Sequence, residues 1–561
     1  MMNHDKVVDH TEDSVADDST TLLITRQKPK RKCSCCMIFL MILSIPLMGG
    51  SAFMLAGGFK NIFDAIIKSQ LELKVGSNSY PIWKQPEMPI YTKFYLFNLT
   101  NPESYSQGEN AKLQEIGPYV YRVFSEKENV TFYSNNTVSY YKNSWWVFNE
   151  ELSGAQSEDD VITVLNPIPL TAAHSIDSDL MLKGLNFAFN AIGESLTVTS
   201  TAGDMLFTGF TDPLLNLTEE FSKFAPPGMK NFDRFAWFYQ RNMSATHDGL
   251  WNMHTGQDSL NNLGKMDLWQ EKNHTDFFDA PCNELSGTAG ELFPPGLNKT
   301  FIQFYTSDLC MSPKLYFKEE LRDKWGVRTY RYAADNHTFS NSSVVPENKC
   351  YCVKGNCAPT GMLNAESCQV GAPAFVSYPH FYLADPIALT NLEGIKEPDP
   401  NRDMFHIDMI PELGVPTQVA ARVQINLRVH PYKGKPFCWK LTTYTPGYCK
   451  PGIFSGVNIT LGKLDIYENV TESYMPMLWF ETIVAVPEGI AYQLNTVAFI
   501  IRTPTMTIVF SVILVLSFLM FTITLLKICK STEERSEYDE LISDDSLQEQ
   551  CTSSNYGVYQ T

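Results

Sequence analysis

The chain has 561 residues, and its 62 acidic against 44 basic side chains give a formal net charge of −18. Proteins that bind nucleic acid neutralise phosphates with clustered Lys and Arg, so this balance argues against a nucleic-acid partner. Two long uncharged apolar runs, one near each end, favour instead a membrane-embedded protein with a large domain between them.

The first apolar run covers residues 37–58 and follows a polar segment, residues 1–36. Four basic residues lie near the end of this segment: Lys28, Lys30, Arg31 and Lys32. A cleaved signal peptide is the alternative interpretation. The preceding segment is far longer than a normal n-region, and the run is long for an h-region. We therefore predict an uncleaved transmembrane helix at 37–58.

The second transmembrane helix is predicted at 506–526. Its core, Ile508 to Leu526, would be about 28 Å long as a helix, close to the hydrocarbon thickness of a bilayer, about 30 Å. Arg502 precedes it, and Lys527 and Lys530 follow it. Lys and Arg collect on cytoplasmic flanks, which predicts that both tails, 1–36 and 527–561, are cytoplasmic. The acidic stretch 533–549 is typical of a disordered tail.

Residues 59–505 would then form one large lumenal or extracellular ectodomain. Glycosylation sequons, Asn-x-Ser/Thr, support this topology because they occur between the two runs and in neither tail. The candidate glycosylation sites are Asn98, Asn129, Asn135, Asn216, Asn242, Asn273, Asn298, Asn336, Asn341, Asn458 and Asn469.

Eight of the 13 cysteines lie in this ectodomain: Cys282, Cys310, Cys350, Cys352, Cys357, Cys368, Cys438 and Cys449. An even number outside the cytosol favours disulfides. A zinc site is the alternative, but the spacings around Cys352 fit it poorly and no histidine pair accompanies them. Spacing alone leaves the disulfide pairing open.

The ectodomain is predicted to be rich in antiparallel β-strands with inserted helices. Residues 422–429 alternate between polar and apolar, and residues 130–141 contain two β-favouring stretches around a polar turn. Between the strands, Met181, Leu185, Ala188 and Ile192 recur at helical spacing, which predicts a helix at 175–192 with Ser175 as its N-cap. Leu182 and Phe189 widen this stripe. The helix is either packed on the core or an exposed recognition helix.

Catalysis has no positive evidence in this sequence. The ectodomain histidines are scattered, and neither a metalloprotease motif, a nucleophile elbow nor a nucleotide-binding loop occurs. We expect no enzyme activity, no catalytic or metal site and no cofactor.

Several stretches together resemble the class B scavenger receptor family. They are residues 94–102 (FYLFNLTNP), 116–122 (IGPYVYR), 304–310 (FYTSDLC) and 371–385 (GAPAFVSYPHFYLAD), with the cysteines from 350 to 368 and the two apolar runs in matching order. The resemblance extends from residue 37 to residue 530. It implies an α+β membrane protein whose ectodomain is a large antiparallel β-barrel with inserted helices and a hydrophobic tunnel, anchored by two transmembrane helices.

The resemblance also implies disulfides Cys282–Cys350, Cys310–Cys368 and Cys352–Cys357. Cys438 and Cys449 are additional to that pattern, and we pair them with each other. The helix at 175–192 falls where the family's apical helices bind ligands, which favours the recognition interpretation. The candidate ligand-binding residues are His174, Leu182, Lys183 and Phe189. Lys183 could meet an anionic lipid, and His174 could gain charge between neutral and lysosomal pH.

The C-terminal tail contains an acidic dileucine pattern, with Glu537 four residues before Leu541 and Ile542. Clathrin adaptors read such signals for sorting to endosomes and lysosomes, although short patterns also arise by chance. Four cysteines that border the spans are candidates for palmitoylation, with unmodified thiols as the alternative: Cys33, Cys35, Cys36 and Cys529.

These features predict a lysosomal or late endosomal receptor that binds lipids, sterols or lipoproteins and transfers cholesterol, fatty acid or phospholipid toward the membrane. One alternative is a sorting receptor that carries a lumenal hydrolase to lysosomes, and another is a scavenger receptor at the plasma membrane. The state of association, monomer or homo-oligomer, is left open.

Overall fold

A computed structural model describes residues 34–215, 233–353, 355, 357–369, 371–436, 460–501 and 504–553. The chain forms two compact units. One comprises the two ends, residues 1–61 and 504–561, and the other comprises residues 62–503. Each unit is described by itself.

The terminal unit is a pair of apolar helices. The helix α1 (Ser34–Phe53) continues through a π-helical turn, η1 (Met54–Gly58), into α2 (Phe59–Leu71), and it packs beside α11 (Thr505–Ser553). The stretches Cys35–Leu71 and Thr505–Glu537 are each long and apolar enough to cross a membrane.

Burial in this helix pair is the reverse of that in a water-soluble protein. Ser44, Ser51, Ser517 and Thr524 are buried, whereas many of the large apolar side chains, such as Phe518, are exposed. Small and hydroxyl-bearing side chains line contacts between helices in lipid, where apolar side chains can face the acyl chains. The two helices therefore suggest a protein that spans the membrane twice.

The helix α11 is longer than the predicted span at 506–526. It continues to Ser553, so the prediction that residues 533–549 lack regular structure is wrong. The stretch contains five glutamates, which have high helix propensity, and Arg535 and Asp539 form an ion pair at 3.9 Å one turn apart.

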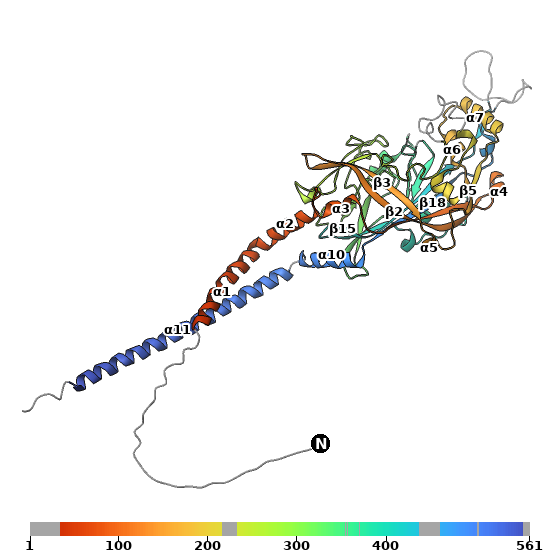
Figure 1. The fold of residues 1–561 in the computed structure, drawn as a ribbon. Helices are drawn as coiled ribbons and strands as arrows, with labels where there is room; N and C mark the ends of the chain where they lie inside the picture. The colour runs from red at the N-terminus through yellow and green to blue at the C-terminus, as the bar shows by residue number, and fades with distance from the viewer. Residues whose placement is uncertain are drawn as a thin grey trace, which may run out of the picture. The chain divides into compact units, whose positions relative to one another are not determined.

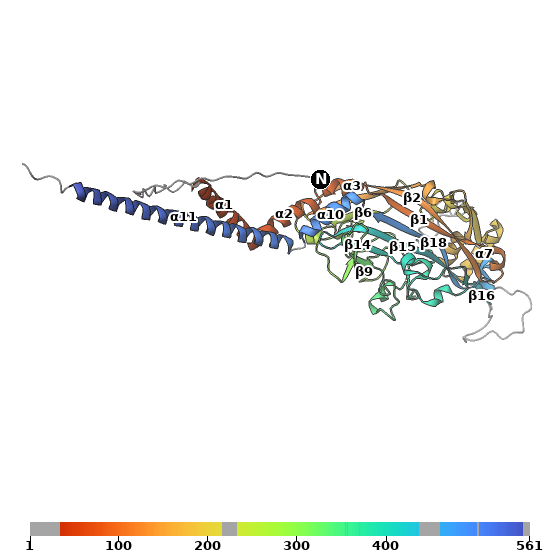
Figure 2. The same ribbon diagram turned by 90° about the horizontal axis from the view of Figure 1, so that it is seen from below.

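The larger unit is built on a 14-stranded sheet whose main path runs β7-β6-β3-β2-β1-β18-β15-β14-β10-β9-β8 (Figures 1 and 2). Its pairings are antiparallel except for that of β13 with β2. The strands are β1 (Ile90–Leu99), β2 (Ala111–Phe132), β3 (Thr137–Phe148), β6 (Leu250–His254), β7 (Met266–Trp269), β8 (Phe301–Gln303), β9 (Lys314–Arg322), β10 (Arg328–Ala333), β11 (Met362–Asn364), β12 (Ala374–Ser377), β13 (Leu392–Glu393), β14 (His406–Ile410), β15 (Val415–Val429) and β18 (Ser473–Ala485).

Local patterning accounts for the central strands. The alternation at 422–429 lies within β15, and the stretches on either side of the polar turn at 134–136 form the β2–β3 hairpin. Two smaller sheets pair β4 (Val161–Leu165) with β5 (Thr197–Thr201) and β16 (Lys433–Pro436) with β17 (Thr460–Lys463).

The two ends of the large sheet are linked by residues 287–289. Met266 N donates to Gly287 O at 3.0 Å, and Ala289 N donates to Gly264 O at 2.8 Å, beside β7. On the other side, Thr288 N donates to Gln303 O at 3.0 Å and Tyr305 N donates to Thr288 O at 2.8 Å, beside β8. The described strands do not by themselves form a closed ring, so the predicted barrel is not confirmed.

Helices lie at both ends of this unit. Figures 1 and 2 show α7 at the end opposite α3 and α10. The helices are α3 (Ser79–Lys84), α4 (Pro102–Ser106), α5 (Glu150–Ser153), α6 (Pro167–His174), α7 (Asp179–Ile192), α9 (Pro400–Asp403) and α10 (Glu488–Ile501). We call the end that carries α6 and α7 the apex.

A buried ion network joins distant parts of this unit around His380, whose side chain is 0 % exposed. Its Nδ1 lies 2.9 Å from Asp403 Oδ1, and its Nε2 lies 2.5 Å from Glu115 Oε2. Lys396 Nζ pairs with Glu115 at 2.6 Å, and Arg402 donates two hydrogen bonds to Asp403, at 2.7 and 2.8 Å. Every buried charge in the network therefore has an opposite charge within hydrogen-bonding distance.

Candidate functional site

The apex begins with α6, a short helix that is buried along most of its length. The Asn166 side chain caps it by accepting a hydrogen bond from Ile168 N at 3.1 Å. Pro167 occupies the first helical position, where a backbone N–H would have no partner within the helix, so its lack of an N–H costs nothing. Ser175 follows the last residue of α6, His174. The predicted role of Ser175 as the N-cap of the next helix is therefore wrong.

The helix α7 starts after Ser178, whose hydroxyl accepts from Met181 N, and ends at Gly193 in the left-handed region at φ 71°. Leu182 and Phe189 are 6 % and 1 % exposed, so they belong to the core and not to the ligand-facing surface predicted for them. Lys183 is exposed as expected.

The outer face of α7 carries exposed apolar side chains, of which the sequence analysis named only Met181, as part of the predicted apolar stripe. Leu180, Met181 and Phe187 are 69 %, 54 % and 77 % exposed. We call these three residues the apical apolar surface. A helical wheel could have identified Leu180 and Phe187, because they lie off the predicted stripe, whereas Met181 was predicted to belong to it.

Two asparagines hold α7 in place against the segment that follows β17. Asn186 Nδ2 and Asn190 Nδ2 donate to Asp465 Oδ2 at 2.9 and 3.0 Å, and Asp465 N donates to Asn186 Oδ1 at 2.7 Å. The hydrogen bonds from Asn190 and Asn186 help to lower the pKa of Asp465 to about 2. The carboxylate therefore stays ionised, and the contact persists, at lysosomal pH.

A pair of carboxyl groups lies between α6 and the end of α7. Asn166 Nδ2 donates to Glu194 Oε1 at 3.1 Å and to Asp212 Oδ2 at 2.9 Å. Burial, together with the nearby charge of Asp212, raises the pKa of Glu194 to about 7. Glu194 is thus an apical group whose protonation changes between neutral and lysosomal pH.

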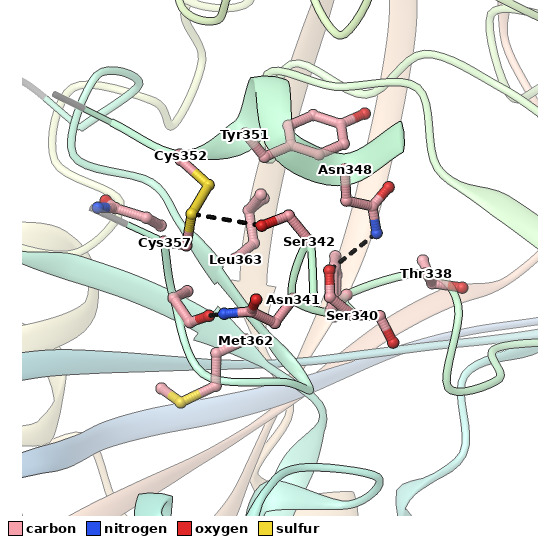
Figure 3. Close-up of a pocket in the computed structure, with 13 residues that line it drawn as sticks. Thr338, Ser340, Asn341, Ser342, Asn348, Tyr351, Cys352, Cys357, Met362 and Leu363 are labelled. Atoms are coloured by element: carbon pink, nitrogen blue, oxygen red, sulfur yellow. Dashed lines mark hydrogen bonds between the residues drawn. A yellow bond between two sulfur atoms is a disulfide. The ribbon is translucent and has the colours of Figure 1, made fainter. Parts of the chain in front are cut away.

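His174 is half-buried, and its Nε2 lies 3.2 Å from Glu366 Oε2. Glu366 also lines a surface cavity of about 390 Å³, together with Asp276, Phe277, Phe278, Val353 and Ser367. A second, much smaller cavity of about 20 Å³ lies beside the Cys352–Cys357 disulfide (Figure 3). It has room for roughly one water molecule, so it is not a ligand site.

Three disulfides tie the 282–368 region together: Cys282–Cys350, Cys310–Cys368 and Cys352–Cys357. These are the pairs that the family resemblance implies. Cys438 and Cys449 lie outside the described residues.

Seven of the candidate glycosylation sites are exposed: Asn129, Asn135, Asn242, Asn273, Asn298, Asn336 and Asn469. Asn98 and Asn341 are half-buried, and Asn216 and Asn458 lie outside the described residues. Asn341 Nδ2, the atom to which a glycan would attach, donates to Ala358 O at 2.5 Å inside the small cavity (Figure 3). Among the sequons that the structure describes, Asn341 is therefore the least suited to modification.

The candidate sorting and palmitoylation residues lie in the terminal unit. Cys35 and Cys36 are exposed near the start of α1, and Cys529 is exposed on α11, while Cys33 lies outside the described residues. Glu537, which is exposed, belongs to the same helix as Leu541 and Ile542.

Comparison with known proteins identifies the family. The model of the CD36 family matches residues 38–448. The chain is 30 % identical over 451 residues to protein peste of Drosophila melanogaster, covering 79 % of this chain and 75 % of that protein. It is 31 % identical to scavenger receptor class B member 1 of Bos taurus (66 % and 72 % covered) and 32 % identical to lysosome membrane protein 2 of Homo sapiens (70 % and 81 % covered). The resemblance to class B scavenger receptors is thus confirmed, and the chain belongs to the CD36 family.

Proposed function

We propose that this chain is a lysosomal or late endosomal receptor that takes up lipid-bearing ligands at its apex and passes lipid toward the membrane. The observation that carries this proposal is the apical apolar surface, because three large apolar side chains are held out into solvent on a helix that is firmly fixed by Asp465. Exposed apolar surface of this kind is typical of a binding site, and without a ligand to cover it the protein would tend to aggregate.

Passage of lipid through the ectodomain would use the barrel and tunnel that the family resemblance implies. The hydrogen bonds of residues 287–289 to both ends of the sheet support closure of the barrel, since they leave neither end without a partner at that point. An acyl chain or sterol in an apolar tunnel would be stabilised by about 0.8 kcal/mol for each buried methylene. No catalytic step is needed.

We expect the double substitution Met181→Ser/Phe187→Ser to weaken ligand binding at least about tenfold. A fully buried apolar side chain contributes about 1.5–3 kcal/mol, and each 1.4 kcal/mol corresponds to a factor of ten in affinity. Equilibrium binding of phospholipid–sterol particles to the full-length protein in detergent measures the effect. The expected stability change is small because both side chains are exposed.

The matched control is Ile387→Ser, which removes an apolar side chain that is 56 % exposed, against 54 % for Met181, but lies in η7 (Pro386–Leu389) and not in α7. It should leave binding unchanged. Equal affinities of the wild type and the double variant would contradict the proposed site.

We further propose that both tails are cytoplasmic and that the exposed sequons carry glycans. In the tails, Cys33, Cys35, Cys36 and Cys529 would be palmitoylated, and Glu537, Leu541 and Ile542 would bind clathrin adaptors. The basic residues next to both spans support this orientation.

The substitution Leu541→Ala/Ile542→Ala is expected to move most of the protein from lysosomes to the cell surface, because the adaptors would lose their two apolar anchor residues. Quantitative surface labelling and lysosomal colocalisation measure the shift. Leu547→Ala, in the same tail but outside the signal, serves as the control. A wild-type protein already at the surface, with no shift in the variant, would favour a plasma-membrane scavenger receptor.

The second candidate function is delivery of a lumenal hydrolase, and the pKa of Glu194 near 7 favours it. Protonation of an apical carboxyl group on the way to the lysosome would change the charge next to α7 and so release a partner. Recovery of a soluble hydrolase on the full-length chain at pH 7, with release at pH 5, would distinguish this function from lipid uptake.

A further inference from the structure

Two lysines face each other in the β2–β3 hairpin, away from the apex. Lys127 and Lys142 are direct cross-strand partners. The Lys127 side chain is only 2 % exposed, and that of Lys142 is 15 % exposed. Like charges placed opposite each other in a sheet are destabilising, so this pair needs a compensating group.

Glu291 supplies one negative charge for both lysines. Its Oε2 lies 3.1 Å from Lys127 Nζ, and its Oε1 lies 3.4 Å from Lys142 Nζ. Burial lowers the pKa of Lys127, and the charge of Glu291 offsets this only in part. Two ammonium groups and one carboxylate leave a net charge of +1 when all three are ionised. The group of Lys127, Lys142 and Glu291 is called the lysine cluster below.

The hydrogen-bonding capacity around the lysine cluster is also unbalanced. Each ammonium group has three N–H donors, and each has one carboxylate oxygen of Glu291 near it. The indole Nε1 atoms of Trp83 and Trp251 are buried and have no acceptor among the described residues. The Trp251 ring centroid is 3.5 Å from Lys142 Nζ, and that of Trp83 is 5.9 Å from Lys127 Nζ. The Glu291 Oε2 atom is likewise buried without a hydrogen-bond partner in the part of the chain that the structure describes, so the two indole donors have no acceptor within reach although one lies in the cluster.

The surroundings of the lysine cluster are apolar. Trp83, Tyr140 and Trp251 belong to a separate core cluster with Leu73, Val138 and Met253, among others. Trp83 comes from α3, which lies at the same end of this unit as α10 (Figures 1 and 2). Glu291 is 29 % exposed and Lys142 is partly exposed, so the cluster is open to solvent on the side of these two residues.

We propose that the lysine cluster binds an anionic group, a carboxylate or a phosphate, at the head of an amphiphilic lipid, with the aromatic residues around it contacting the apolar part. The anion balances the excess positive charge of the two lysines and accepts hydrogen bonds from donors that Glu291 does not reach. Binding of a charged group by two partly desolvated ammonium groups is stronger than at an exposed lysine, because water screens the attraction less. This site deepens the proposed lipid transfer and rests on it, since it separates anionic from neutral lipids at the end of the ectodomain farthest from the apex.

The test compares two ligands with the same tail and different head charge: a fluorescent long-chain fatty acid and its methyl ester. Both are titrated onto the full-length protein in neutral detergent at pH 7.4. The wild type is expected to bind the acid at least about tenfold more tightly than the ester. Lys142→Met should abolish that preference while leaving the affinity for the ester unchanged. The variant keeps the ion pair of Lys127 with Glu291, whose charges cancel, so no excess positive charge remains to attract the acid.

Glu291→Gln should act in the opposite direction and strengthen binding of the acid severalfold, because it removes the carboxylate that competes with the bound anion for the two lysines. Lys142→Arg, which keeps the charge, should keep the preference. Lys84→Met is the matched control: Lys84 is an exposed lysine of α3 that pairs with Glu126 at 3.4 Å outside the cluster. It should have no effect.

Equal affinity of the wild type for acid and ester, or a preference that survives in Lys142→Met, would overturn the proposal. Displacement of the acid by inorganic phosphate, in the same concentration range as a phosphate-bearing lipid, would also overturn it, because the site would then bind free anions without a lipid tail. If neither acid nor ester binds, the proposed lipid transfer fails as a whole. If both bind equally, only the lysine cluster loses its role.

Discussion

Replacing His380 with alanine is expected to lower the free energy of unfolding by about 3–5 kcal/mol, the usual cost of removing one partner from a buried ion network. The substitution leaves Glu115 and Asp403 without the cation between them. It also affects three chain segments besides the one that carries His380. Glu115 lies in β2, Asp403 lies in α9, and Trp479 of β18 donates to Glu115 at 3.2 Å. Thermal or denaturant unfolding of the full-length protein in detergent measures the loss.

The control for this substitution is His337→Ala. His337 Nδ1 also lies 2.8 Å from an aspartate, Asp335, but its side chain is 59 % exposed. Solvent-exposed pairs of this kind contribute about 0–1 kcal/mol. The contrast between the two variants therefore isolates the effect of burial, and equal losses would show that the network around His380 is not important for stability.

The effect of His380→Ala should depend on pH. Burial by itself would lower the pKa of His380, but the hydrogen bonds to Asp403 and Glu115 raise it above 6.5 overall. The stability that charged His380 contributes is thus fully present below pH 6.5 and is lost as the pH rises through its folded-state pKa. Burial opposes ionisation of Glu115, yet the bonds from His380 and Lys396 lower its pKa from 4.5 to about 2.

The contribution of Glu115 is therefore present above pH 4.5 and is lost as the pH falls toward 2. The stability difference between wild type and His380→Ala should be largest between about pH 4.5 and 6.5. This range includes the acidic interior of lysosomes. A difference that does not change between pH 5 and pH 9 would contradict the assignment of a charged His380.

Gly287→Ala is expected to destabilise the larger unit by about 2–5 kcal/mol. Gly287 adopts φ +81°, and a Cβ atom there would lie 2.0 Å from Gln303 O, which is backbone and cannot turn away. The left-handed conformation costs a non-glycine residue about 1–2 kcal/mol, and the clash adds a further 1–3 kcal/mol or so. Thermal unfolding measures the loss, and hydrogen exchange of the Thr288 and Tyr305 amides shows whether the bonds to β8 open.

Gly290→Ala provides a close comparison for Gly287→Ala. Gly290 has φ +84°, but a Cβ atom there would only contact Phe304 Cδ2 at 3.5 Å, an ordinary van der Waals distance. Gly290→Ala should lower the free energy of unfolding only by the cost of the left-handed backbone conformation, about 1–2 kcal/mol. If the two variants lose the same stability and the amides of 288 and 305 stay protected, residues 287–289 do not act as a rigid link between the ends of the sheet.

The sequence by itself was sufficient for features that depend on neighbours along the chain. The two apolar terminal helices follow from uninterrupted apolar runs. Two-residue alternation around a polar turn predicts β15 and the β2–β3 hairpin, and the helical stripe predicts α7. The three disulfide pairs, in contrast, came from the family resemblance and not from spacing. Within α7, periodicity identified a buried stripe but could not tell which face would meet the ectodomain core and which would meet a ligand.

Only the tertiary structure decided the features that depend on contacts between distant segments. His380 meets Glu115, 265 residues away in the chain, and becomes a buried cation instead of one scattered histidine among several. Leu182 and Phe189 become core residues because the rest of the apex covers them, which leaves Leu180, Met181 and Phe187 outside. Lys127 and Lys142 lie just outside the predicted hairpin at 130–141, and their burial depends on Glu291, Trp83 and Trp251 from three other segments. Burial and charge pairing are properties of the whole packed unit, so no local pattern in the sequence specifies them.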